Sequence, residues 1–201
     1  MTDAARLADP LPALDRLPPG SAVILRHYDA PDRRPLAAKV AARCRQLGLK
    51  FLVAGAWRLA AHVGADGLHL AAYLARRGPE PGARLWLKRK TRFLTVAAHG
   101  ARGLARARFI RADAALLSPV FATASHPGVR PLGLTRAAML IRAARLPVMA
   151  LGGIALEDAH MLRGRGFAGV AGIGFGIRSA AERRRGRQYL GAAESPRRAV
   201  E

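Results

Sequence analysis

Two kinds of residue in this chain could bind an anion: a polar loop after one apolar run, and glycines after two others. The stretch "LLSPVFATASHPG", residues 116–128, begins as a buried strand and ends in a turn that holds Thr123, Ser125 and His126. Hydroxyl and imidazole groups donate hydrogen bonds to phosphate oxygens. The loop could therefore be a site for a phosphorylated ligand or an ordinary turn.

The glycines follow the last two apolar runs. "PVMAL" continues into "GGI" and the helical stretch "ALEDAHML", and the final run continues into "GIGFGI", residues 172–177. Glycine lets the backbone approach a ligand closely, and a helix N-terminus presents N–H groups and a positive dipole end. Each cluster alone is equally consistent with a tight turn. Together they predict a phosphate site at Gly152, Gly153, Gly172, Ile173 and Gly174.

Three histidines lie at the ends of apolar runs and are candidates for a pocket: His27, His69 and His99. His62 and His160 lie within helical stretches, where solvent exposure is the simpler expectation. No histidine pair has the His-x-x-x-His spacing of a zinc helix. The single cysteine, Cys44, falls on the apolar face of a helix and is expected in the core. We therefore predict no metal site built from histidine or cysteine.

Short apolar runs, which alternate with helical stretches rich in Ala, Arg and Leu, must position these residues. The runs predict strands at 22–26, 51–54, 67–70, 93–97, 114–118, 147–151 and 169–173. Repeated βα units of this number favour a closed (β/α) barrel, with an open doubly wound sheet as the alternative. Barrel chemistry lies after the strands, so Asp66 and Asp113, which precede strands, are expected to be structural.

The composition indicates one folded domain. The chain has 201 residues, 51% of them hydrophobic, and we divide it into a helical segment at 1–20, a barrel at 21–178 and a basic tail at 179–201. No apolar run approaches the roughly 18 residues that span a bilayer, and the start lacks the pattern of a signal peptide. We expect a cytoplasmic protein with no membrane partner.

The formal charge of +21 raises the question of a nucleic-acid partner. All but four of the 34 basic residues are Arg, a bias that GC-rich codons also produce, so a solvated arginine surface is the simpler interpretation. The densest runs, "RLWLKRKTR" and "ERRRGRQ", lack the interleaved aromatic residues of a base-stacking surface. A nucleic-acid partner is therefore the least favoured of the functions considered.

Four motifs in this order resemble a known family. "GADGLHL", "LLSPVFATASHPG" with "PLG", "LPVMALGGI" and "GFAGVAGIGFGI" are similar to the thiamine phosphate synthase and TenI-like family of small (β/α)8 TIM barrels, over about residues 22–177. Members of that family join a thiazole phosphate to an aminopyrimidine diphosphate, with Mg²⁺ helping pyrophosphate to leave. The TenI branch isomerises the thiazole with a histidine. The resemblance implies a role in thiamine biosynthesis and a thiazole phosphate-like ligand.

The resemblance extends to the phosphate-binding residues. The glycines at 152–153 and 172–174 match the family's site for the thiazole phosphate, and Thr123 matches a threonine that contacts pyrophosphate. Arg26 matches the arginine of a Gln-x-Arg-x-Lys pattern, although Ile24 and Tyr28 replace the other two residues. His126, beside Ser125, stands where the family has lysine, and a neutral histidine pairs less well with a diphosphate.

The magnesium-binding residues of the family are missing. Ala54 and Gly55 replace Asn-Asp, while Ala72 and Leu74 replace the Gln and Asp that follow the third expected strand. Mg²⁺ requires such oxygen ligands. The family's serine is Ala97 and the TenI histidine is Pro119. The resemblance thus implies a divergent member that is weak or inactive as a synthase. If the synthase reaction is retained, the protein is a transferase that needs Mg²⁺. The alternative is a non-catalytic or regulatory binder of a phosphorylated ligand.

The amino terminus has no candidate for the first strand of such a barrel. The eight residues "MTDAARLA" precede a helix like the family's first, and they contain no β-rich apolar run. We expect "SAVILR" to supply the first strand, with translation assigned to an internal Met. A barrel without its first strand exposes two edges, which favours homo-oligomers or instability.

Overall fold

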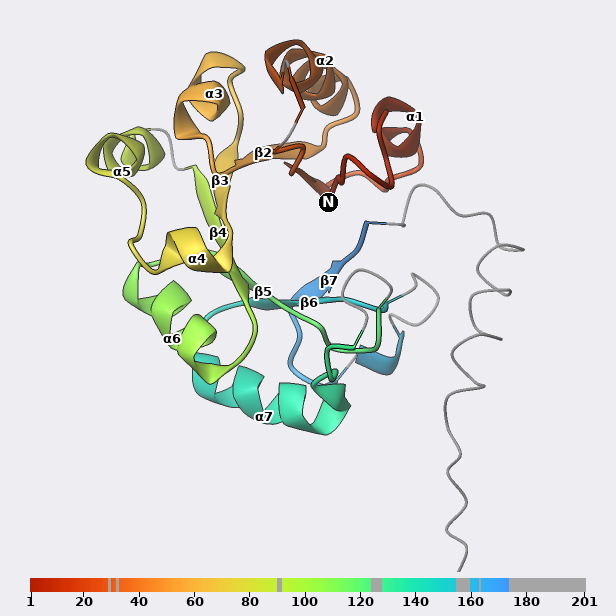
Figure 1. Cartoon of the computed structure of the whole chain (residues 1–201), viewed down its shortest axis with the longest axis vertical. Coiled ribbons are helices and arrows are strands. Elements are labelled where there is room, and N and C mark those ends of the chain that lie inside the picture. The colour runs from red at the N-terminus through yellow and green to blue at the C-terminus, as the bar shows by residue number, and fades with distance from the viewer. Residues whose placement is uncertain are drawn as a thin grey trace, which may run out of the picture.

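This computed structural model describes residues 1–28, 30–31, 33–89, 92–123, 128–154, 160–162 and 164–173. Within those residues one parallel sheet contains seven strands in sequential order. They are β1 (Ala22–Leu25), β2 (Lys50–Ala54), β3 (Gly67–Leu70), β4 (Phe93–Ala98), β5 (Ala114–Leu117), β6 (Val148–Leu151) and β7 (Gly169–Ala171). Each lies within two residues of the predicted position, and the curled sheet with outer helices confirms the barrel-type fold (Figure 1).

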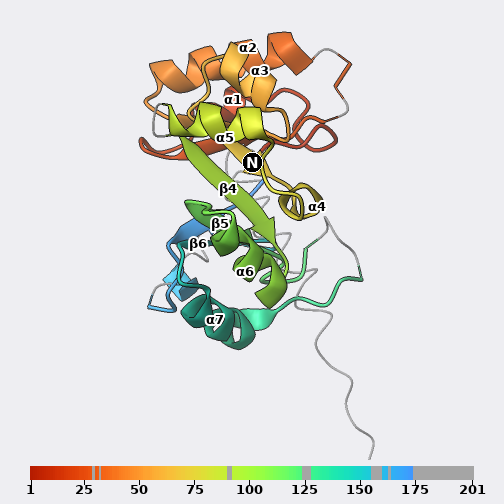
Figure 2. The same ribbon diagram turned by 90° about the vertical axis from the view of Figure 1, so that its left-hand side faces the viewer.

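Helices connect the strands and lie outside the curled sheet (Figures 1 and 2). The described residues form α1 (Leu11–Leu14), α2 (Arg33–Gln46), α3 (Trp57–His62), α4 (Ala72–Ala75), α5 (Pro81–Lys88), α6 (Ala101–Phe109) and α7 (Gly133–Ala144). Helix α1 lies in the segment expected at 1–20. Most of the helix expected at "ALEDAHML", residues 155–159, lies outside the described residues, as does the tail at 179–201.

Both faces of the sheet are buried, which explains why its strands read as continuous apolar runs. Outward side chains such as Leu25 and Val53 pack against the helices. Inward side chains of Ile24, Leu52 and Leu116 form a smaller cluster, against which Met149 and Met1 pack. Side chains from several strands therefore line the interior of the barrel.

Two aspartates connect neighbouring strands at the amino-terminal ends of those strands. Asp66 accepts a hydrogen bond of 2.9 Å from the Phe51 amide, and Asp113 accepts one of 2.7 Å from the Leu94 amide. These contacts confirm the structural role predicted for both carboxylates. Cys44 is fully buried in the core, as predicted, and burial raises the pKa of its thiol to about 12.

Among the described residues, β1 and β7 form the two edges of the sheet, and the amino terminus lies between them (Figure 1). Residues 1–10 are all described, and none of them is in a strand. "SAVILR" supplies β1, the first strand of the sheet, as expected. Met1 and Thr2 nevertheless contact both edges, because the Met1 amino group donates to the Gly172 carbonyl and the Thr2 amide donates to the Ile24 carbonyl.

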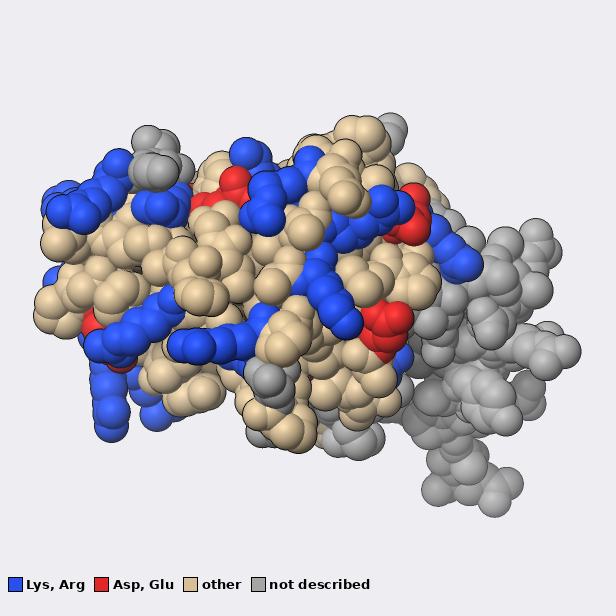
Figure 3. Space-filling view, turned by 90° about the horizontal axis from the view of Figure 1, so that it is seen from above, with Lys and Arg blue, Asp and Glu red and all other residues tan. Residues whose placement is uncertain are grey.

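Basic side chains are spread over the face seen in Figure 3, with acidic side chains between them. Several arginines are engaged within the fold. The Arg84 Nε donates to the Pro79 carbonyl at 3.0 Å, and Arg92 donates to the Trp86 carbonyl at 2.7 Å while its guanidinium lies 4.4 Å from the Trp86 ring centroid. Some of the arginine side chains thus bind backbone carbonyls at or near helices of the fold. None of the helices in the described part of the chain has the length and apolar character needed to cross a membrane.

Candidate functional site at the ends of the strands

All strands of the sheet are parallel, so their carboxyl ends form one rim. The residues of this rim come from six segments that are distant in sequence. They include Arg26 after β1, Gly55 after β2, His99 after β4, Ser118 after β5, Gly152 and Gly153 after β6, and Gly172 and Ile173 after β7. The fold therefore brings the predicted phosphate-binding residues and their neighbours to one end of the barrel.

The glycines after β6 and β7 lie side by side, because Leu151 pairs with Ala171 in the sheet. Gly152 and Gly153 have φ angles of +93° and +67°, which favour glycine. The two segments can present backbone N–H groups toward the end of the barrel. Gly174, the last member of the predicted site, lies outside the described residues.

Gly153 is also required by packing, a role that the sequence did not reveal. The Phe121 amide donates to the Gly152 carbonyl at 3.1 Å, so the loop after β5 lies directly on the end of β6. A methyl group added at Gly153 would lie 2.8 Å from the Phe121 Cβ, closer than carbon atoms approach without displacement. Of the residues predicted in this loop, Thr123 is half-buried, while Ser125 and His126 lie outside the described residues.

Arg26 is a half-buried cation that follows β1 at the rim. Its positive charge lowers the pKa of the Met1 amino group and that of His69, which places it close to both. It also donates a hydrogen bond to the Tyr28 side chain. A half-buried guanidinium at this position is a strong hydrogen-bond donor for phosphate.

His27 contacts the amino-terminal segment through both ring nitrogens. Its Nε2 donates to the Leu7 carbonyl at 3.0 Å, and its Nδ1 lies 2.9 Å from the Thr2 Oγ1. A neutral imidazole with Nε2 protonated accepts at Nδ1 from the Thr2 hydroxyl. These contacts account for the buried position of His27, one of the three histidines predicted for a pocket.

His69 is buried inside the barrel, beneath the rim. Its Nδ1 lies 3.0 Å from the Thr95 Oγ1, and the register places the two residues opposite each other on β3 and β4. Burial, with the charges of Arg26 and the amino terminus, lowers the pKa of His69 to about 3. The imidazole is therefore neutral over the physiological pH range.

His99 is exposed at the rim and joins the ends of two strands. Its Nδ1 donates to the Ser118 carbonyl at 2.9 Å. This bond fixes the ring at the start of the loop after β5, which carries Thr123. His99 is thus the predicted pocket histidine whose position allows contact with a ligand at the rim.

The corner formed by the ends of β1, β2 and β3 is occupied by other side chains. A methyl group added at Gly55 would lie 3.3 Å from both Leu74 and Tyr28. Arg33 lies 5.3 Å from the Tyr28 ring centroid and donates to the carbonyls of Leu25 and Ala54 at 2.8 and 2.9 Å. Burial raises the pKa of Tyr28 and lowers that of Arg33.

These residues do not fit a magnesium ion, which requires oxygen ligands from carboxylates, carbonyls or water. The described residues contain no group of three His, Cys, Asp or Glu side chains able to hold a metal.

Arg33 was missed at the sequence level because nothing in the local pattern shows that an arginine at the start of α2 reaches carbonyls 8 and 21 residues away.

Comparisons with known proteins show which family this chain resembles. Residues 13–175 match the family model described as thiamine monophosphate synthase. A putative thiamine-phosphate synthase 2 of Aquifex aeolicus is 31% identical over 75% of this chain and 80% of its own length. A thiamine-phosphate synthase of Methanoculleus marisnigri is 36% identical over 86% of this chain and 78% of its own length. The solved structure of a thiamine phosphate pyrophosphorylase from Pyrococcus furiosus superposes with a TM-score of 0.70 and 20% identity, covering 96% of this chain and 95% of that one.

Proposed function

Because the chain belongs to the thiamine monophosphate synthase family, we propose that its rim binds a phosphorylated small molecule of the thiazole phosphate class. The backbone at Gly152, Gly153, Gly172, Ile173 and Gly174 holds the phosphate. Arg26 supplies a positive charge, and the loop with Thr123, Ser125 and His126 covers the ligand. Backbone N–H groups bind an anion independently of side-chain identity, so this part of the site tolerates sequence drift.

The second part of the proposal is that the chain is weak or inactive as a synthase. The observation that supports it is the contrast between the two halves of the rim. Glycines occupy the half at β6 and β7, whereas Tyr28, Leu74 and Arg33 fill the corner at β1, β2 and β3 in place of carboxylates. The family's reaction uses Mg²⁺ at that corner, and these side chains offer it no carboxylate oxygen.

Calorimetric titration with thiazole phosphate tests the binding half of the proposal. A hydrogen bond to a charged group contributes about 1.5–3 kcal/mol, so Arg26→Gln should weaken binding by roughly 10- to 100-fold. Arg108→Gln is the matched control. Arg108 is exposed on α6, and its substitution removes the same charge at a distance from the rim. Equal affinity in both variants, or no binding by the unmodified chain at millimolar ligand, would overturn the proposal.

A further inference from the structure

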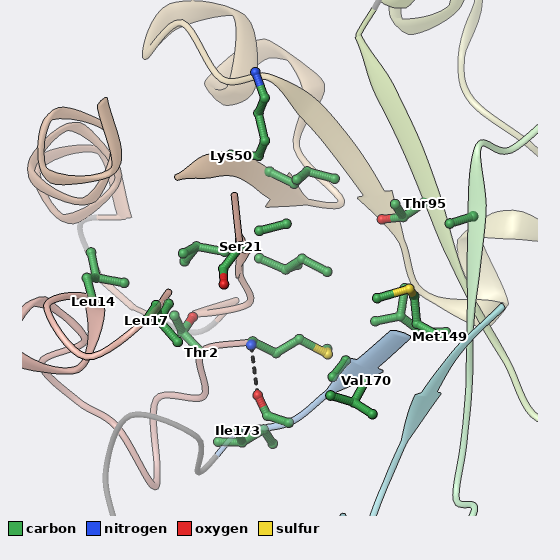
Figure 4. Close-up of a pocket in the computed structure, with 18 of the residues that line it drawn as sticks. Thr2, Leu14, Leu17, Ser21, Lys50, Thr95, Met149, Val170 and Ile173 are labelled. Atoms are coloured by element: carbon green, nitrogen blue, oxygen red, sulfur yellow. Dashed lines mark hydrogen bonds between the residues drawn. The ribbon is translucent and has the colours of Figure 1, made fainter. Parts of the chain in front are cut away.

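The side chain of Arg26 stands at the edge of an apolar interior. Arg26 lies two residues after Ile24, whose side chain points into the barrel, and alternate residues of an extended chain share one face. Ile24 also lines a mainly apolar cavity of about 450 Å³, together with Met149 and Val170 (Figure 4). Apolar side chains accept no hydrogen bonds. The hydrogen-bond partners of the Arg26 guanidinium therefore lie at the rim.

Tyr28 receives the Arg26 guanidinium at the rim. The guanidinium donates a hydrogen bond to the phenol oxygen of Tyr28, which lies two residues further along the chain. A guanidinium has more N–H donors than a single phenol oxygen can accept, so donors remain for a ligand. The phenol thus holds the guanidinium without occupying all of it.

The ring of Tyr28 is itself held by the ends of two strands. The Arg33 guanidinium lies 5.3 Å from the ring centroid. It donates to the carbonyls of Leu25 and Ala54, the last residues of β1 and β2, at 2.8 and 2.9 Å. A methyl group added at Gly55 would lie 3.3 Å from the Tyr28 Cε1, so the ring lies close to the backbone that follows β2. The strand ends therefore set the position of the phenol oxygen.

The protonation state of Tyr28 suits it to orient a cation. Burial raises the pKa of the phenol above its ordinary value and outweighs the opposing charges of Arg26 and Arg33, so the phenol is neutral at physiological pH. A carboxylate at this position would cancel the charge of Arg26, whereas a neutral phenol leaves that charge available to an anion. The lysine that the family has at this position cannot accept a hydrogen bond.

Arg26 lies near the glycines after β7 that we propose for the phosphate. The Arg26 amide donates to the Thr2 Oγ1 at 3.0 Å, and the adjacent Met1 amino group donates to the Gly172 carbonyl at 2.9 Å. The segments after β1 and β7 thus lie on either side of one extended chain, roughly 10 Å apart if each spacing is that of neighbouring strands. An arginine side chain and a phosphate group together span such a distance.

We propose that Tyr28 is a positioning residue for phosphate binding: its phenol oxygen, with the ring held by Arg33, orients the Arg26 guanidinium toward the phosphate of the ligand. This inference rests on the proposed function, because it requires a rim that binds a phosphorylated molecule. It adds a role for the residue that stands in place of the family's lysine, which is to orient the remaining cation. A guanidinium that is already ordered loses less conformational entropy when the phosphate binds.

Phosphorus NMR titrations with thiazole phosphate, which also measure millimolar affinities, test the proposal. The chains compared are the unmodified protein, Tyr28→Phe, Arg26→Gln and the variant that carries both substitutions. Tyr28→Phe keeps the ring beside Arg33 and removes only the hydroxyl. Tyr73→Phe is the matched control, because it removes the same hydroxyl from an exposed tyrosine of α4 near Tyr28.

We expect Tyr28→Phe to weaken binding of thiazole phosphate by roughly 3- to 10-fold, the cost of ordering one long side chain on binding. Tyr73→Phe should bind as the unmodified chain does. In the Arg26→Gln background, Tyr28→Phe should cause no further loss, because the phenol acts only through Arg26. A general distortion of the corner would instead weaken binding in both backgrounds.

Three results would overturn the inference and leave the proposed function intact. They are unchanged affinity in Tyr28→Phe, the same loss with and without Arg26, and an equal loss in Tyr73→Phe. If the unmodified chain does not bind thiazole phosphate at millimolar concentration, the proposed function fails and the role of Tyr28 fails with it.

Discussion

At the scale of single residues, His69 shows how the environment decides what a side chain does. A histidine at the end of a strand has the chemistry for a pocket, but here the ring is buried against Thr95 and its pKa is about 3. It therefore contributes to the interior of the barrel as a neutral hydrogen-bonding group. Its inward direction follows from strand alternation, whereas its depth depends on the neighbouring strands.

The lowered pKa of His69 predicts a specific loss of stability in acid. An unfolded histidine protonates near pH 6.5 and the folded one near pH 3, so the unfolded chain binds the proton first as the pH falls. The stabilisation is complete above about pH 6.5 and is lost toward pH 3, by up to about 1.4 kcal/mol per pH unit. We expect the free energy of unfolding, measured with urea between pH 6 and 4.5, to fall less steeply with decreasing pH in His69→Leu than in the unmodified chain. The exposed His62→Leu control should keep the original slope; equal slopes in all three proteins would refute this prediction.

Gly153 allows a second test at the residue scale. Comparison with Gly48, which has nearly the same φ angle, separates the cost of packing from the cost of backbone conformation. Gly153→Ala should destabilise the fold more than Gly48→Ala, although their φ angles are +67° and +66°. An added methyl at Gly48 has no neighbour within 4 Å, whereas at Gly153 it meets Phe121. The left-handed conformation costs both variants about 1–2 kcal/mol, and overpacking adds about 1–3 kcal/mol for Gly153 alone. Equal free energies of unfolding would mean that the loop after β5 yields without cost.

At the scale of elements, the strands were predictable and several side-chain partners were not. Burial on both faces makes each strand a continuous apolar run, and Asp66 and Asp113 directly precede such runs. The contacts of Arg33 and His27 join segments that are far apart in sequence, so no local pattern contains them. The order of glycines at the rim was visible in the sequence, but the packing of Gly153 against Phe121 depends on tertiary structure.

The basic segment around α5 leads to a prediction about DNA binding. Arg84 and Arg92 are engaged within the fold, and the ring of Trp86 already carries the Arg92 guanidinium, while Lys90 lies outside the described residues. We expect any DNA binding to be weak and to disappear at about 0.15 M salt, because contacts to backbone phosphate are strongly salt-dependent. A gel-shift titration at low and physiological salt measures this. Tight, sequence-selective binding at physiological salt would contradict it.

At the scale of the whole molecule, the candidate site lies at the carboxyl ends of the strands, and a cavity of about 450 Å³ is lined by residues of β1, β7 and the amino-terminal segment. The two are in contact at Gly172, which follows β7 and whose carbonyl accepts a hydrogen bond from the Met1 amino group.

The most direct test of the proposed function is the rate of thiamine phosphate formation from thiazole phosphate and the aminopyrimidine diphosphate, with excess Mg²⁺ and a chain shown to bind thiazole phosphate. Electrostatic groups that stabilise a departing diphosphate contribute roughly 3 kcal/mol each, about a hundredfold in rate. Carboxylates are absent after β2 and β3, and Tyr28 and His126 stand where the family has lysine. We predict turnover at or near the uncatalysed rate. A magnesium-dependent turnover of about 1 s⁻¹, an ordinary enzyme rate, would contradict the proposal that binding has outlasted synthase activity.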